Sequence, residues 1–219
     1  MSIASCAARS QAISRRGIVP NLNHPGGNIT GFARNEATLG GKWLELLSEI
    51  APGLKRAAIM FNPDINRTSV YFMPPFETAA RSLKVEVITA PVHDDVEIET
   101  AIIALGRETG GGLVVNNDAW MILHRASIIS AAARNNVLAV YQQPVFVREG
   151  GLLSYGADVV DLIRRAASYV DRILRGEKPG DLPVQLPTKF EMVVNRKTAT
   201  ALGLAIPPSI LLRADEVIE

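Results

Sequence analysis

Three short apolar segments of this chain end on amide or carboxylate side chains, and a helix-like segment follows each of them. The apolar segments are residues 57–61, 113–115 and 138–141. The polar residues that follow are Asn62, Asp64 and Asn66 in the first case, Asn116, Asn117 and Asp118 in the second, and Gln142 in the third. Strands that alternate with helices predict an α/β fold with a parallel sheet, and small ligands bind outside the carboxyl ends of such strands. The pattern therefore predicts the edge of the sheet at which a ligand lies.

Hydrophobic periodicity predicts the order of the elements along the chain. We expect helices over residues 38–51, 74–83, 95–107, 120–136, 159–174 and 196–202. We expect strands over residues 57–61, 85–90, 113–117, 138–142, 152–155 and 190–194. The second helix is expected to begin at Pro74, because proline is tolerated in the first turn of a helix but not in its middle. Trp43 is expected in the core, and residues 1–17 are expected to form a flexible lead-in.

The charge and the residue counts argue against several classes of function. With 23 Lys and Arg against 22 Asp and Glu, the net charge is +1, which supplies no basic surface for nucleic acid. A single cysteine excludes an internal disulfide and a four-cysteine metal site, and the three histidines, His24, His93 and His124, are scattered. The sequence has no glycine-rich nucleotide loop and no Gly-x-Ser-x-Gly motif. We therefore expect no enzyme activity, no cofactor, no bound metal and no nucleic-acid partner.

The polar residues at the strand ends suit a small zwitterion. The run from Asn116 to Asp118 holds more polar groups than one helix cap uses, whereas Asn62 is explained equally well as a cap. A surplus carboxylate suits a ligand ammonium, and helix N-termini suit a ligand carboxylate. Tyr155 and Phe146 are expected either to form an apolar wall near the ligand or to lie in the core. An amino acid is therefore the expected type of ligand.

Six segments, in the same order along the chain, resemble those of one known family. They are residues 25–32 (PGGNITGF), 41–47 (GKWLELL), 61–63 (FNP), 150–156 (GGLLSYG), 187–191 (PTKFE) and 211–218 (LLRADEVI). Together they resemble the ABC-transporter substrate-binding proteins of the group that includes tryptophan- and tyrosine-binding members. Because several motifs occur in one order from about residue 18 to the end, the resemblance is specific.

This resemblance implies a type I periplasmic-binding fold, in which two α/β lobes, each a parallel sheet between helices, hold a ligand in the cleft between them. Lobe two would comprise residues 33–149 and 188–219, and lobe one would include residues 18–32 and 151–187. The implied function is that of the solute-binding component of an ABC-type importer. It would bind a small polar solute, such as an amino acid, aromatic ones included, and deliver it to permease subunits in the membrane.

The front of the chain departs from the family pattern. Family members carry an export signal and most of lobe one before the turn at residues 25–28, where this chain has some twenty residues of unlike sequence. We therefore expect lobe two to be complete and lobe one to be partial, with weakened ligand binding. The strand near residue 152 and the helix from residue 159 would lack the sheet they normally pack on, and self-association through these segments is expected. The resemblance implies a periplasmic or cell-envelope location; without a signal peptide, a genuine start at Met1 would imply the cytoplasm.

Two other classes of function stay open at this point. The effector-binding core of a transcription regulator shares the two-lobed fold, but it would need a helix-turn-helix ahead of the first lobe. A small α/β enzyme would need a nucleophile with a base in reach at the ends of the strands near Phe61, Asn117 and Gln142. A helix-turn-helix would therefore support the first alternative, and a nucleophile beside a base would support the second.

Overall fold

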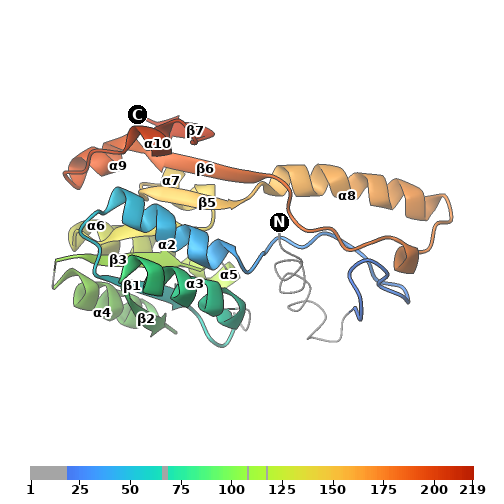
Figure 1. Cartoon of the computed structure of the whole chain (residues 1–219), viewed down its shortest axis with the longest axis horizontal. Coiled ribbons are helices and arrows are strands. Elements are labelled where there is room, and N and C mark those ends of the chain that lie inside the picture. The colour runs from blue at the N-terminus through green and yellow to red at the C-terminus, as the bar shows by residue number, and fades with distance from the viewer. Residues whose placement is uncertain (1–18, 66–68, 108, 117) are drawn as a thin grey trace. The chain divides into compact units, whose positions relative to one another are not determined.

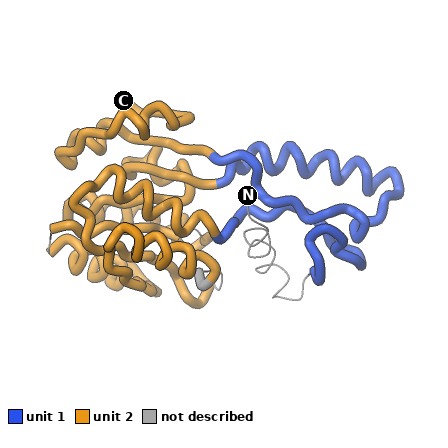
Figure 2. The backbone as a smooth tube through the Cα atoms, viewed as in Figure 1, with its two compact units in different colours: residues 1–37, 157–190 blue, residues 38–156, 191–219 orange. Residues whose placement is uncertain are grey.

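The computed structural model describes residues 19–65, 69–107, 109–116 and 118–219 (Figure 1). The chain forms two compact units (Figure 2). Unit 1 comprises Met1–Ala37 and Ala157–Phe190, and unit 2 comprises Thr38–Gly156 and Glu191–Glu219. Within the described residues, none of the helices is long and apolar enough to cross a membrane.

Seven strands form one sheet in the order β2-β1-β3-β4-β5-β6-β7. They are β1 (Arg56–Phe61), β2 (Glu86–Pro91), β3 (Gly111–Val115), β4 (Leu138–Tyr141), β5 (Leu153–Ala157), β6 (Phe190–Asn195) and β7 (Glu216–Ile218). The pairs β1–β2, β1–β3, β3–β4, β4–β5 and β6–β7 are parallel. This mostly parallel sheet confirms the predicted α/β class.

Helices cover both faces of the sheet in unit 2 (Figure 1). They are α2 (Leu39–Ile50), α3 (Ser69–Leu83), α4 (Asp95–Gly106), α5 (Ala119–Leu123), α6 (Arg125–Arg134), α7 (Pro144–Arg148), α9 (Arg196–Ala201) and α10 (Pro208–Leu211). Successive residues of a strand point to opposite faces, and Met60 of β1 packs in one apolar cluster with Ile102 of α4 and Ile128 of α6. The Cα of Gly112, on the other face of β3, lies close to Leu47 of α2. The strands are therefore buried on both sides, as a parallel sheet requires.

Two glycines let α2 and α3 approach closely. A Cβ atom on Gly40 would lie 2.3 Å from the backbone oxygen of Phe72, and one on Gly41 would lie 3.1 Å from that of Pro75. Beside this contact the ring of Trp43 packs on Phe72, with 5.0 Å between the ring centroids. Trp43 is fully buried, which confirms its predicted place in the core.

Helix α3 begins earlier than the sequence predicts. Pro74 and Pro75 lie inside it rather than in its first turn. Each proline removes a backbone donor from the helix, but Phe72 and Phe76, on either side of the prolines, are buried. Burial of two aromatic side chains against the rest of unit 2 therefore outweighs the local preference of proline.

The single helix expected over residues 120–136 is interrupted at His124. This residue ends α5 and precedes α6, and its ring stacks on Trp120 at 3.9 Å between centroids. Its Nδ1 lies 2.8 Å from a carboxylate oxygen of Asp95 on α4. The side chain of Arg125 donates to the carbonyl oxygen of Ile122 at 2.8 Å. The predicted helix is therefore divided into α5 and α6 at His124, where these side-chain contacts are made.

Strand β5 corrects an expectation about residues 152–155. The expectation that this strand lacks a sheet to pair with is wrong, because Leu153 pairs with Val140 of β4 in the seven-stranded sheet. Leu153 is fully buried there. Strand β5 therefore continues the apolar interior of unit 2 up to Gly156.

Unit 1 contains α8 (Val159–Leu174) and a short 3-10 helix, η1 (Pro179–Asp181), among its described residues. Two extended segments run beside each other: the N–H of Gln185 donates to the carbonyl oxygen of Gly31, and the carbonyl oxygen of Gln185 accepts from the N–H of Ala33. The side chain of Asp158 accepts from the N–H of Asp161 and so caps α8. Unit 1 is thus held by backbone hydrogen bonds and one helix rather than by a sheet of its own in these residues.

Candidate functional site

Three neighbouring strands bring predicted residues into one row, with two of them just after the ends of β3 and β4 and the third, Tyr155, within β5. The register pairs Val115 of β3 with Tyr141 of β4, so the residues that follow, Asn116 and Gln142, are neighbours. The register of β4 and β5 places Tyr155 next in the same row. The row lies at the edge of the sheet where parallel α/β folds bind ligands.

Three amide side chains at this edge are buried. The exposed fractions of Asn62, Asn116 and Gln142 are 3%, 0% and 4%. Buried amides need hydrogen-bond partners, and both Asn116 and Gln142 have interactions with their surroundings. The structure therefore brings these three predicted residues together as a polar edge within a largely apolar unit.

Asn62 has a local structural role. Its side-chain oxygen accepts hydrogen bonds from the backbone N–H groups of Asp64 at 3.0 Å and Ile65 at 3.3 Å. This is an Asx turn, which fixes the path of the chain as it leaves β1. The side-chain amide group of Asn62 is left for other partners, so capping accounts for only half of its hydrogen-bonding capacity.

Asp118 combines a cap with a second carboxylate oxygen. One oxygen accepts from the backbone N–H of Met121 at 2.8 Å and so caps α5. The other oxygen, Oδ2, is buried and has no hydrogen-bond partner among the described residues. A buried oxygen without a partner is costly in a folded protein. This atom is therefore the strongest unsatisfied acceptor for a ligand at the sheet edge.

The two predicted wall residues differ in position. Tyr155 is partly exposed, and its backbone oxygen accepts from the indole N–H of Trp43 at 2.7 Å. Phe146 is buried and stacks on Tyr141 at 4.8 Å between ring centroids. Phe146 is thus a core residue, while Tyr155 keeps a place at the edge. Burial also raises the pKa of the Tyr141 phenol above its usual range.

The remaining predicted residues are not part of the buried row. Asp64 is exposed, and its carboxylate lies 3.8 Å from Nε2 of His93. His93, one of the three scattered histidines, follows β2 and also lies 2.9 Å from the Glu97 carboxylate. The hydrogen bond with Glu97 raises the pKa of His93. Asn66 and Asn117 lie outside the described residues.

The contact of His93 with Asp64 depends on the pairing of β1 with β2, which the residue pattern alone does not give. Because β2 pairs with β1 in register from Arg56 with Glu86 to Phe61 with Pro91, residues just after the two strands become neighbours. The adjacency of β1 and β2 could be guessed from the βαβ order. Ser154 of β5 was also not singled out; its buried hydroxyl has no hydrogen-bond partner among the described residues.

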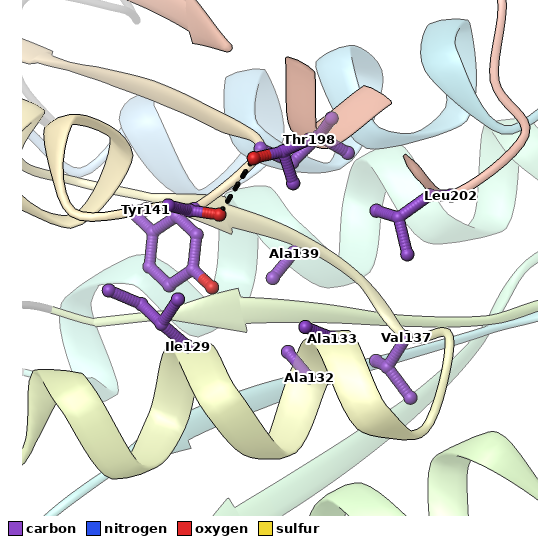
Figure 3. Close-up of a pocket in the computed structure, with 11 residues that line it drawn as sticks. Ile129, Ala132, Ala133, Val137, Ala139, Tyr141, Thr198 and Leu202 are labelled. Atoms are coloured by element: carbon purple, nitrogen blue, oxygen red, sulfur yellow. Dashed lines mark hydrogen bonds between the residues drawn. The ribbon is translucent and has the colours of Figure 1, made fainter. Parts of the chain in front are cut away.

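A metal site and an apolar hollow are the other candidates to consider in the part of the chain described. No group of three or more His, Cys, Asp or Glu side chains there could hold a metal ion. A small hollow between α6, β4 and α9 is lined mainly by apolar side chains (Figure 3). In it, the Thr198 hydroxyl donates to the carbonyl oxygen of Gly150 at 2.9 Å. The hollow therefore offers no set of free polar groups comparable with the sheet edge.

Comparison with known proteins gives a matching family model and several similar proteins. The family model described as "ABC transporter substrate binding protein" matches residues 5–218. A curated relative, the tyrosine-binding protein of Clostridioides difficile, is 24% identical over 188 residues, which are 86% of this chain and 53% of the relative. The chain thus spans about half the length of that relative.

Two solved structures have closely similar folds. One is a conserved domain protein from Vibrio cholerae, and the other is the ABC domain from Streptococcus pneumoniae in complex with L-Trp. Each is 25% identical with a TM-score of 0.83, and each match covers 94% of this chain and 68% of the solved chain. The α/β architecture is that of the type I periplasmic-binding proteins, as the resemblance implied. The family match over nearly the whole chain, together with this fold, shows that the chain belongs to the ABC transporter substrate-binding protein family.

Proposed function

We propose that this chain binds an amino acid, aromatic ones included, at the carboxyl edge of the unit 2 sheet. In this proposal the edge forms one wall of the binding cleft. The bound solute is then passed to the permease subunits of an ABC-type importer at the cell envelope. In this proposal lobe two is unit 2, Thr38–Gly156 with Glu191–Glu219, rather than residues 33–149 with 188–219, because β5 pairs with β4 in its sheet.

The observation that carries the proposal is the buried Oδ2 atom of Asp118, which follows the same strand as the buried Asn116, while the buried Gln142 follows the neighbouring strand. A carboxylate oxygen without a partner suits a ligand ammonium, and side-chain amides can both donate to a ligand carboxylate and accept from an ammonium. An amino acid supplies both of these groups on one carbon. The edge is thus matched to a zwitterion better than to a sugar or a phosphate.

The related proteins support an aromatic side chain on that amino acid. One relative is named as tyrosine-binding, and one similar structure was solved with L-Trp. The partly exposed Tyr155, next to Gln142 in the row, offers a ring against which an aromatic side chain can pack. We therefore place tryptophan and tyrosine first among the solutes to test.

Calorimetric titration of the whole chain with L-Trp and L-Tyr tests the proposal. Asp118→Asn keeps the cap of α5 but removes the charge, so the affinity should fall by about 10- to 100-fold, as expected for a hydrogen bond to a charged group. Asp94→Asn is the matched control. Asp94 caps α4 through the N–H of Glu97 at 2.8 Å, the same distance as at Asp118.

The two variants separate a binding role from a structural one. We expect both variants to stay folded, since each keeps its helix cap, with loss of affinity only in Asp118→Asn. Equal affinities in both variants would remove Asp118 from the site. Absence of any heat with every amino acid would contradict the proposed ligand class.

A further inference from the structure

We propose that Trp43 is a positioning residue for the binding of aromatic solutes, because its indole holds the part of β5 that carries Tyr155. This inference rests on the proposed function, in which Tyr155 offers its ring to the solute. The indole N–H of Trp43 donates to the backbone carbonyl oxygen of Tyr155 at 2.7 Å. Trp43 is fully buried, so it acts on a bound solute only through the residues that it contacts.

This hydrogen bond lies where the pairing of β4 with β5 ends. Among the described residues, the last pair in the register joins Tyr141 with Ser154. Tyr155 follows that pair, and the Trp43 indole brings a donor to its carbonyl oxygen from another element, α2. A buried indole N–H needs an acceptor. Here the acceptor is the backbone of a residue at the candidate site.

The residue after Tyr155 also fixes this segment. A Cβ atom on Gly156 would lie 2.1 Å from the backbone oxygen of Gln142. Only glycine allows the two backbones to approach so closely. The pairing of Ser154 before Tyr155 and the close approach of Gly156 after it place Tyr155 next to Gln142, and the Trp43 indole holds its carbonyl group. The backbone that carries the Tyr155 ring is therefore fixed from both β4 and α2.

The alternation of side chains along β5 directs Tyr155 to the side of the sheet on which Trp43 lies. Ser154 pairs with Tyr141, whose side chain packs in the apolar cluster of α4 and α6. The following residue of a strand points to the opposite face, and that face is the one covered by α2. Tyr155 is partly exposed there. Its ring thus lies at the end of the sheet on a backbone that Trp43 holds in place.

Loss of the hydrogen bond should therefore change the selectivity of binding as well as its strength. A displaced Tyr155 ring loses its contact with an aromatic solute, which is worth a factor of about 3 to 10 in affinity. L-Ala carries the same ammonium and carboxylate groups without a ring, so its affinity should change by less than about twofold. The ratio of the two affinities distinguishes the positioning of Tyr155 from a general loss of structure.

Calorimetric titration of the whole chain and of Trp43→Phe with L-Tyr and L-Ala tests the inference. Trp43→Phe keeps a ring in the core but removes the N–H donor, so the affinity for L-Tyr should fall by about 3- to 10-fold. Phe72→Leu is the matched control, because Phe72 packs on the same indole at 5.0 Å between ring centroids. This control should lower the thermal stability and leave the ratio of the two affinities unchanged, since the N–H donor stays.

A double-mutant cycle tests whether the effect passes through Tyr155. In a Tyr155→Ala background the ring is already absent, so Trp43→Phe should cause no further loss of affinity for L-Tyr. An equal loss in both backgrounds would overturn the proposal, because Trp43 would then act on the site by another route.

A measurement with Trp43 in place applies even if Trp43→Phe does not fold. Trp43 and Trp120 are the two tryptophans, so the indole N–H signal that remains in nitrogen-15 spectra of Trp120→Phe belongs to Trp43. In the unsubstituted chain this signal should shift on saturation with L-Tyr and stay nearly unchanged with L-Ala. Equal shifts with both solutes, or none with either, would overturn the inference.

The outcomes separate this inference from the proposed function on which it rests. Equal affinity for L-Tyr in the unsubstituted chain and in a folded Trp43→Phe would overturn the role of Trp43 alone. Absence of binding of every amino acid by the unsubstituted chain would overturn the proposed function and this inference together.

Discussion

Unit 2 and unit 1 treat their apolar side chains in opposite ways. In unit 2 the strands are covered by helices on both faces, and residues such as Ile59, Phe76 and Val140 are fully buried. In unit 1 the helix α8 buries Leu162 and Tyr169 but exposes Ile163 and Leu174. Helices of both units have an apolar stripe in their sequence. The difference in burial therefore shows that an amphipathic pattern predicts a helix but does not supply the surface that covers it.

The two units also differ in how firmly they fix the positions of their side chains. A sheet buried on both sides fixes the positions of Asn116 and Gln142 through the strand register. In unit 1 the equivalent support comes from single contacts, such as the salt bridge of Lys189 with Asp158 at 2.8 Å. Changes in unit 2 should therefore cost more free energy of unfolding than similar changes in unit 1.

The largest contrast is expected between two phenylalanines. Phe76→Ala should lower the free energy of unfolding of unit 2 by ~3–5 kcal/mol, because it empties a fully buried site. Phe32→Ala, which removes the edge-on contact with Tyr169, should cost only ~1 kcal/mol. Both tryptophans, Trp43 and Trp120, lie in unit 2, so their fluorescence during denaturation reports on that unit. An equal shift of this transition in both variants would show that the units unfold as one.

The close contact of α2 with α3 should be the next most sensitive feature. Gly40→Ala places a methyl group about where the backbone oxygen of Phe72 already lies, so we expect a loss of ~1–3 kcal/mol from overpacking. Gly53→Ala is the control, because nothing lies within 4 Å of the added atom. Denaturation midpoints that are the same for both variants would contradict the close packing of the two helices.

A smaller effect is expected from the charge that caps α8. The hydrogen bond with Lys189 lowers the pKa of Asp158. The stabilisation is therefore fully present above the unfolded pKa of about 3.9 and is lost as the pH falls through the lower folded value. We expect the helical signal in far-ultraviolet circular dichroism to decline less steeply on acidification in Asp158→Asn, which keeps the cap but not the charge. Parallel acid curves for the two chains would show that this contact does not stabilise unit 1.

The smallest effect should come from the exposed His93 beside β1 and β2. Its pKa is raised by the hydrogen bond with Glu97, so its contribution to stability is fully present below the unfolded pKa of about 6.5. That contribution is lost as the pH rises through the raised folded value. Melting temperatures of the chain and of His93→Gln should therefore converge above neutral pH. In the Glu97→Gln background the difference between them should be small at every pH, and a large remaining difference would point to Asp64 instead.

Local sequence signals predicted much of the fold. Three predicted helices begin after caps at Asp94, Asp158 and Asn195, where each side-chain oxygen binds an N–H group only three residues away. The strands β1 to β4 also lie close to their predicted ranges, since their buried runs are short and bounded by turns. The predictions were wrong where contacts with distant residues determine the structure. At Pro74, buried aromatic side chains stabilise a helix that continues through two prolines.

The candidate site was predicted in part. Asn62, Asn116 and Gln142 could be found because each directly follows an apolar strand, and parallel strands end at one edge. The sequence could not predict that one oxygen of Asp118 caps α5 while Oδ2 is buried without a partner. The burial of Oδ2 depends on how the surrounding elements pack. For the same reason the sequence could not predict whether Phe146 lines the ligand site or lies in the core. In the structure it stacks on Tyr141 and belongs to the core.

The sequence by itself determined the alternation of strands and helices, the polar ends of the strands and the family, because these depend on residue order and short-range hydrogen bonds. Only the tertiary structure decided that β5 joins the sheet beside β4, and which side of α8 is buried. The physical reason is that apolar burial is not directional. A stripe of apolar side chains specifies that a surface should be covered, and the elements that pack against it determine whether it is.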